Sequence, residues 1–108
     1  MEYFNFFSMK DTESLKALMS DDIVLKDWNT HVTGKVSVIE VIDNLFAMAN
    51  SIKATPVSFF SNSDYSYAVQ VAILVNKEPL IDVIDVIDFD TDGKIAKILA
   101  FKYERFDY

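Results

Sequence analysis

The chain has 108 residues, 51% of them hydrophobic, with 2 Gly, 2 Pro and no Cys. This length suffices for a single core, so we expect residues 1–108 to form one domain. The net charge of -7 argues against a nucleic-acid partner or an anionic membrane surface, and the absence of Cys excludes disulfides and fits a cytoplasmic location. No apolar run approaches the roughly 20 residues of a membrane span, and the N-terminus lacks the features of a signal peptide.

Two short helices are predicted at the start of the chain. Asp11 is a favourable N-cap for the second helix, which we expect to end at residues 20–22. Aromatic side chains recur at helical spacing in the first helix, residues 3–9: Tyr3, Phe6 and Phe7. The apolar stripe of the second helix consists of Leu15, Leu18 and Met19.

A short strand is predicted at residues 23–28, followed by a loop at residues 29–34. Alternation along this strand places Ile23, Leu25 and Asp27 on one face. Asp27 is therefore a carboxyl that follows two apolar neighbours on its own side of the sheet.

The clearest helix is predicted at residues 35–50, and strands are predicted at residues 51–60 and 65–75. Pro56 cannot donate a ladder hydrogen bond, so it predicts an edge strand or a bulge. The apolar stripe of the long helix consists of Val38, Ile39, Ile42, Leu45, Phe46 and Ala49.

Residues 79–102 predict two long strands joined by a tight turn at Thr91-Asp92-Gly93. Asp85 is the one carboxyl in an otherwise apolar row of side chains on one face. A carboxyl in apolar surroundings loses hydration and tends to keep its proton, so Asp85 is the first candidate for chemistry. The row consists of Ile81, Val83, Asp85, Ile87 and Phe89.

The order of these elements predicts an α+β fold: a curved, cone-shaped, mixed or antiparallel sheet wrapped around helices. Such a sheet encloses a conical cavity, which apolar aromatics and a few inward carboxyls would line. The 9 Phe and 5 Tyr of this short chain suit that role. We therefore expect an apolar small molecule as the ligand.

The hairpin also carries a family resemblance. The run from Asp82 to Ile95, DVIDVIDFDTDGKI, continuing to Ala100-Phe101, resembles the corresponding hairpin of bacterial steroid delta-isomerases (ketosteroid isomerases). These enzymes belong to the nuclear transport factor 2-like, SnoaL-like superfamily, whose fold is cystatin-like. The segment from Asp21 to Asp27 is similar to the strand that carries the catalytic base in that family. The resemblance covers essentially the whole chain.

The resemblance implies an active site. It places Asp27 on the general base, Asp85 on the protonated Asp of the oxyanion hole and Tyr3 on the oxyanion-hole Tyr, a division of roles established for ketosteroid isomerase. The implied reaction moves a proton alpha to a carbonyl and needs no cofactor and no metal. The expected ligand pocket is lined by Phe7, Ile42, Phe46, Val83, Ile87 and Phe101. The chain departs from the family pattern at Met19 and Ile42, in place of supporting tyrosines, and at Lys102, in place of a Trp.

Other interpretations of these residues stay open. Asp27 could cap the following loop or pair with Lys26 or Lys35, Asp85 could be a structural carboxyl, and Tyr3 could be a packing residue. The alternative to an isomerase is a noncatalytic binding module for an apolar small molecule. A third possibility is a structural protein that uses the outer face of the sheet.

Four further expectations concern the remaining residues. A homodimer through the sheet is expected, because the outward Leu80, Ile84 and Val86 are too apolar to face water alone. His31 is expected to be a solvated loop residue, and Trp28 to pack in the core or at the dimer interface. An epoxide hydrolase activity is disfavoured, because Arg105, the only Arg, lies in the tail.

One acidic motif resembles the opening of a calcium-binding loop. Asp88, Asp90 and Asp92 precede Gly93 with the spacing of an EF-hand. Leu99 occupies the twelfth position, where a bidentate Glu is needed, and the flanking segments alternate like strands. The motif therefore predicts a β-turn and not a calcium site.

Overall fold

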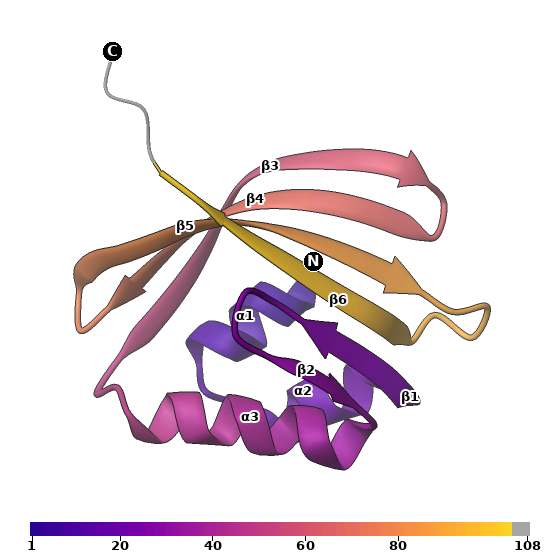
Figure 1. The fold of residues 1–108 in the computed structure, drawn as a ribbon, viewed down its shortest axis with the longest axis horizontal. Helices are drawn as coiled ribbons and strands as arrows, with labels where there is room; N and C mark the ends of the chain where they lie inside the picture. Colours follow the sequence, from indigo (N-terminus) through magenta and orange to yellow (C-terminus); the bar gives the residue numbers. More distant parts are fainter. Residues whose placement is uncertain (105–108) are drawn as a thin grey trace.

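The computed structural model describes residues 1–104. These residues form three helices and six strands, with the sheet arching over the helices (Figure 1). The helices are α1 (Glu2–Ser8), α2 (Thr12–Leu18) and α3 (Lys35–Ala47). The strands are β1 (Met19–Lys26), β2 (His31–Thr33), β3 (Ile52–Ser63), β4 (Ser66–Val75), β5 (Glu78–Phe89) and β6 (Ile95–Tyr103).

The strands form one curved sheet in the order β2-β1-β6-β5-β4-β3. The β1–β6 pair is parallel, and every other neighbouring pair is antiparallel. The sheet does not close into a barrel, because β2 and β3 lie at its two edges. This arrangement confirms the predicted α+β architecture with a mixed sheet around helices.

The two predicted N-terminal helices are confirmed. Tyr3, Phe4 and Phe7 are the buried residues of α1, which packs against β3. Asp11 caps α2 as expected, because its Oδ1 accepts a hydrogen bond from the Ser14 backbone N–H at 3.1 Å. The aromatic face of α1 and the Asp11 cap of α2 therefore specify these two helices, which are too short to be stable alone.

The predicted end of α2 and start of β1 are wrong. The helix ends at Leu18, and β1 begins at Met19, four residues earlier than alternation suggested. Met19 is 1% exposed and pairs with Ile95 of β6, so a long-range contact holds the polar run of residues 20–22 in the strand. The strand ends at Lys26, so Asp27 lies one residue beyond it.

Further boundaries differ from the prediction, and β3 runs to Ser63, three residues beyond its predicted end. Residues 31–33 form β2, an edge strand paired with β1, where a loop was expected. Helix α3 ends at Ala47 and not at Asn50. Leu45, expected in the apolar stripe, is 38% exposed, whereas the other stripe positions are buried.

The turn and edge predictions for the long strands are confirmed. Pro56 lies on the edge strand β3, beside a register shift between residues 56 and 58. Asn76 and Lys77 both have positive φ and form the tight turn between β4 and β5. Asp90 closes the acidic turn after β5, because its Oδ1 accepts the backbone N–H groups of Asp92 and Lys94 at 2.9 Å.

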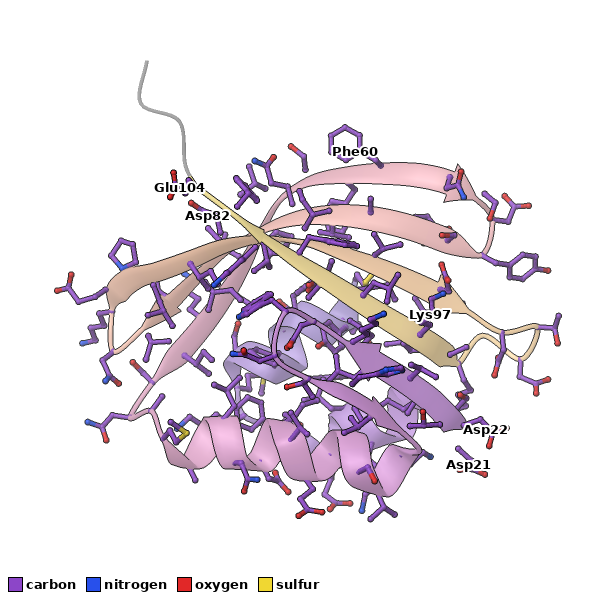
Figure 2. All side chains as sticks on the ribbon, in the orientation of Figure 1. Asp21, Asp22, Phe60, Asp82, Lys97 and Glu104 are labelled. Carbon is purple, nitrogen blue, oxygen red and sulfur yellow. The ribbon has the colours of Figure 1, made fainter. Side chains whose placement is uncertain are left out.

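The two faces of β5 are as alternation predicted. Val83, Asp85 and Ile87 are buried on the inner face, which packs against the helices. The outer face carries exposed apolar side chains: Leu80 is 67% exposed and Phe101 56%. Figure 2 shows Phe60 projecting from β3 on the side away from α3. The core therefore lies between the concave face of the sheet and the three helices.

Arg105 lies outside the described residues. Within residues 1–104, no helix is long and apolar enough to cross a membrane.

Lys10 joins the end of α1 to the end of α3. Its Nζ donates hydrogen bonds to the carbonyl oxygens of Phe46 at 2.9 Å, Asn50 at 3.4 Å and Ala49. The last carbonyls of a helix lack intrahelical partners, and a cation there also opposes the helix dipole favourably. The single ammonium thus fixes α3 against the N-terminal segment that carries Tyr3.

We expect Lys10→Met to lower the free energy of unfolding by about 2 kcal/mol, the contribution typical of hydrogen bonds from a charged donor. Urea unfolding should show a lower midpoint with an unchanged slope. The matched control is Lys16→Met, because Lys16 makes only a 4.0 Å ion pair with exposed Glu13. The control should change stability by less than about 0.5 kcal/mol, and equal midpoints for the two variants would contradict the capping role of Lys10.

Candidate functional site

Asp85 lies in the middle of the inner face of β5. Its neighbours across the sheet are Val69 on β4 and Ala100 on β6, and Val83 and Ile87 flank it along the strand. The residue is 8% exposed, and it is the one polar residue among the buried residues of 1–104. The strand alternation that predicted this carboxyl is therefore the feature that buries it.

Burial and, to a smaller extent, the negative charge of Asp27 together raise the pKa of the Asp85 carboxyl from 3.8 to about 7. Desolvation acts because an ionised carboxylate loses its hydration among apolar side chains. Near neutral pH a substantial fraction of Asp85 therefore keeps its proton and can donate a hydrogen bond.

Tyr3 projects from α1 into the same region of the core. It is 6% exposed, and its ring packs edge-on against Phe4 at 5.1 Å and tilted against Phe7 at 6.0 Å. Burial raises the pKa of the Tyr3 hydroxyl, and the charge of Asp85 raises it further. Tyr3 is therefore a neutral hydrogen-bond donor close enough to Asp85 for the two to interact.

The Asp85 carboxyl and the Tyr3 hydroxyl have no hydrogen-bond partner within residues 1–104. In this part of the chain, every fully buried side-chain nitrogen or oxygen is hydrogen-bonded. The oxygens of the two residues are therefore not sealed in the core, and they adjoin space that a water-sized group can enter. Two donors without protein partners are thus available to a ligand.

Asp27 follows the last residue of β1 and caps the next loop. Its Oδ1 accepts the backbone N–H groups of Asn29 and Thr30, both at 2.7 Å. The pairing with Lys35 is not formed, because the Lys35 ammonium lies 3.5 Å from Asp21. The cap fixes the carboxyl orientation and leaves Oδ2 without a partner among the described residues.

The sheet register brings the two acids into one row. Asp85 pairs with Ala100 on β6, and the parallel register of β6 with β1 makes Asp27 level with Ala100, one step beyond the Lys26–Leu99 pair. Two strand spacings separate the acids, which corresponds to about 10 Å between their Cα atoms. Ala100 lies between them with only a methyl group, so the row leaves room for a small molecule.

A groove of about 330 Å³ opens at the Asp27 end of this row. It lies where β1 has ended and β6 continues, so side chains from both sides of β6 reach it. The Lys102 ammonium lies 5.4 Å from the centre of the Trp28 ring. The groove is lined by Lys26, Asp27, Trp28, Leu99, Ala100, Phe101 and Lys102.

The predicted ligand-pocket residues fall into two groups. Five of them are buried in the core, where Phe7 and Phe46 pack edge-on at 5.1 Å. Phe101 lies on the opposite side of β6 from Ala100 and lines the open groove. Ligand contact by the buried five stays a prediction, because none of them lines the groove at the end of β1. The five are Phe7, Ile42, Phe46, Val83 and Ile87.

Sequence reasoning missed the pairing of Trp28 with Lys102. Trp28 was expected in the core or at a dimer interface, but it is 43% exposed at the groove. Alternation from Ile98 through Ala100 could have placed Lys102 on the inner row. His31 is exposed as predicted, although it lies in a strand. Within residues 1–104, no cluster of three or more His, Cys, Asp or Glu side chains could hold a metal ion.

Comparison with known proteins assigns the fold. A family model described as a SnoaL-like domain matches residues 1–98. No curated protein matches the chain significantly. Among solved structures, a candidate polyketide cyclase from Sinorhizobium meliloti is 21% identical with a TM-score of 0.80, over 91% of this chain and 88% of that one.

Two other solved structures share this architecture. A candidate ketosteroid isomerase from Kribbella flavida is 16% identical with a TM-score of 0.75, over 99% of this chain and 76% of its own. The epoxide hydrolase/cyclase-like enzyme SalBIII, which acts in pyran ring formation in the polyether salinomycin, is 19% identical with a TM-score of 0.80, over 94% and 85% of the chains. At these identities the likeness establishes the fold.

The raised pKa of Asp85 predicts a pH-dependent stability. Between pH 3.8 and about 7 the folded chain holds a proton at Asp85 that the unfolded chain has released, so stability falls as pH rises through this window. Asp85→Asn keeps the shape of the protonated acid and has no proton to lose. From pH 4 to pH 8, urea unfolding should show the variant gaining roughly 4 kcal/mol relative to the unmodified protein.

The control for this titration is Asp92→Asn, which removes an exposed carboxyl from the turn after β5. Its stability difference from the unmodified protein should stay constant between pH 4 and pH 8. A similarly flat difference for Asp85→Asn would mean that Asp85 titrates like a solvated carboxyl, contrary to its burial.

Proposed function

The chain belongs to the SnoaL-like family, and from this membership and the buried Tyr3 and Asp85 we propose that it is a small-molecule isomerase acting by proton transfer. The substrate is an apolar molecule with a carbonyl group and a neighbouring carbon–carbon double bond. The reaction moves a proton from the carbon alpha to the carbonyl to a carbon conjugated with it.

The burial of the Asp85 carboxyl is the observation that carries this proposal. A carboxyl that is 8% exposed, has a pKa raised to about 7 and has no partner among residues 1–104 is a hydrogen-bond donor held ready for an anion. The Tyr3 hydroxyl supplies a second donor from the facing helix. Two such donors stabilise a developing enolate oxygen far more strongly in apolar surroundings than in water.

Asp27 supplies the base. Its Oδ2 removes the proton alpha to the carbonyl, and the electrons of the broken C–H bond form the enolate, whose oxygen accepts hydrogen bonds from Tyr3 and Asp85. Asp27 then returns the proton to the far carbon of the conjugated system. The double bond has moved, the carbonyl is restored and Asp27 is a carboxylate again. The two backbone N–H groups on Oδ1 keep the carboxyl aimed throughout.

The test is the conversion of cyclohex-3-enone to its conjugated isomer, followed by ultraviolet absorbance. Asp27→Asn should lower kcat by about 10³-fold, within the range for loss of a general base. Tyr3→Phe should lower kcat by about 10²-fold, as for loss of one oxyanion donor. Ketone binding, followed by the emission of Trp28, should remain within about twofold for Asp27→Asn, since the base contributes to the transition state.

Asp92→Asn is the control for charge and should retain full activity, because Asp92 is exposed in the turn beyond the end of β5. An unmodified protein that binds the ketone but does not isomerise it would instead support the noncatalytic binding module. Activity that survives Asp27→Asn would refute the role of the base.

We further propose that a second copy of the chain covers the outer face of the sheet. The centre of this face is apolar: Phe101, 56% exposed, pairs with Ile84, and Phe60 on β3 is 59% exposed. The Asp88 carboxylate accepts a hydrogen bond from Ser66 at 2.6 Å and lies 4.0 Å from Lys97 (Figure 2 labels Lys97). Contact between two copies would therefore bury apolar area. The Asp88 carboxylates of the two copies would not repel each other strongly, because each already has partners in its own chain.

Sedimentation velocity tests the dimer. The unmodified protein should sediment as a dimer at micromolar concentration, and Ile84→Lys should sediment as a monomer because it places a charge at the centre of the apolar face. Val57→Lys is the matched control, since Val57 is 60% exposed on the edge strand β3. A monomeric unmodified protein, or a dimer that tolerates Ile84→Lys, would exclude this interface.

A further inference from the structure

We propose that the groove at the end of β1 binds the carboxylate of an apolar small molecule and that Lys102 is the residue that recognises it. This inference rests on the proposed proton-transfer function and narrows its substrate class to unsaturated ketones that also carry a carboxylate. The groove has a volume of about 330 Å³, which is at the small end of the range for ligand sites.

Lys102 lies on the same row of the sheet as the proposed site. On β6 it pairs with Val83, and the next pair along the inner face joins Ala100 to Asp85. Lys102 is therefore two residues from Ala100, or about 7 Å along the strand. A ligand that reaches from Asp85 past Ala100 would bring its far end to Lys102.

The Lys102 ammonium is positioned without an anionic partner. It lies over the Trp28 ring at 5.4 Å, a cation–π contact that holds the charge but uses the ring face as its only partner. Within residues 1–104, Lys102 makes no ion pair and no hydrogen bond through Nζ. Its N–H donors are thus free for a carboxylate. Five of the eight other lysines of the described part are engaged by acids or carbonyls: Lys10, Lys16, Lys35, Lys94 and Lys97. The exposed Lys26, Lys53 and Lys77 are not, and of these three only Lys26 lines the groove.

The charge of the groove is opposite to that of the chain. The whole sequence has 17 acidic and 10 basic residues, whereas the groove is lined by two lysines, Lys26 and Lys102, and one acid, Asp27. Oδ1 of that acid is already hydrogen-bonded to two backbone N–H groups. An anion is therefore attracted to the Lys102 end of the groove on a protein that otherwise repels it.

The remaining walls are suited to the apolar body of such a ligand. Trp28, Leu99, Ala100 and Phe101 contribute them. In this pose the ketone oxygen accepts hydrogen bonds from Tyr3 and Asp85, the reacting carbons lie beside Asp27 and the carboxylate meets Lys102. The lysine thus acts on binding and orientation and takes no part in proton transfer.

Two probes that differ only in charge test the inference: 4-phenylbutanoate and its amide, 4-phenylbutanamide. Trp28 is the only Trp of the chain and lines the groove, so its emission reports binding. The unmodified protein should bind the carboxylate about tenfold more tightly than the amide. Lys102→Met should remove this preference and leave the affinity for the amide unchanged. Lys102→Arg should restore it, because a guanidinium also binds carboxylates.

Lys53→Met is the matched control, because it changes the net charge equally on the exposed edge strand β3 and should keep the preference. Equal affinities of the two probes in the unmodified protein would overturn the inference. So would a loss of preference in Lys53→Met equal to that in Lys102→Met, or a parallel loss of both probes in a folded Lys102→Met.

This binding measurement is separable from the test of the proposed function. Asp27→Asn should abolish isomerisation of the neutral ketone and preserve the discrimination between the two probes. If the protein is inactive on the ketone yet prefers the carboxylate probe, the Lys102 site stands and the proposed isomerase function is refuted. If it isomerises the ketone without preferring the carboxylate probe, the isomerase function stands and the Lys102 site is refuted.

Discussion

The site depends on the desolvation of one carboxyl. Asp85 lies between Val83 and Ile87 on the inner face of β5, where any apolar residue would stabilise the fold more. No group of residues 1–104 donates to the carboxyl a hydrogen bond that would hold it ionised, so a substantial fraction of Asp85 keeps its proton near neutral pH. A group that weakens the core in this way is typical of sites where function and stability conflict. The aromatic face of α1 then completes the low-dielectric surroundings in which a neutral acid and a phenol act together.

The sequence pattern predicted the helices, strands and turns that are determined by neighbouring residues. The alternation of β5, the turn at Gly93 and the start of α3 at Lys35 could all be read from neighbouring residues. The start of β1 could not, because residues 20–22 are polar and only the parallel pairing of Met19 with Ile95 holds them extended. A three-residue edge strand such as β2 has too little pattern to be recognised at all.

The candidate site was predictable to the same extent. Asp85 could be identified from its apolar row, whereas Tyr3 and Asp27 depended on a family resemblance. The contact of Lys102 with Trp28 joins residues 74 positions apart in the chain, and no local pattern indicates it. The two interpretations of Asp27, as a loop cap and as a candidate base, are compatible. Oδ1 caps the loop, and this cap fixes the orientation of Oδ2, which has no hydrogen-bond partner among the described residues.

The position of β6 in the sheet has a consequence for biosynthesis. Although β6 is the last of the described strands in sequence, it lies between β1 and β5 and joins the N-terminal half of the molecule to the rest. During translation β1 therefore lacks its second neighbour in the sheet until residues 95–103 have left the ribosome. Non-local pairing of this kind slows folding and keeps strand edges open in the nascent chain. The nascent chain thus depends on β6 to assemble the cone, and a chaperone has that interval in which to act.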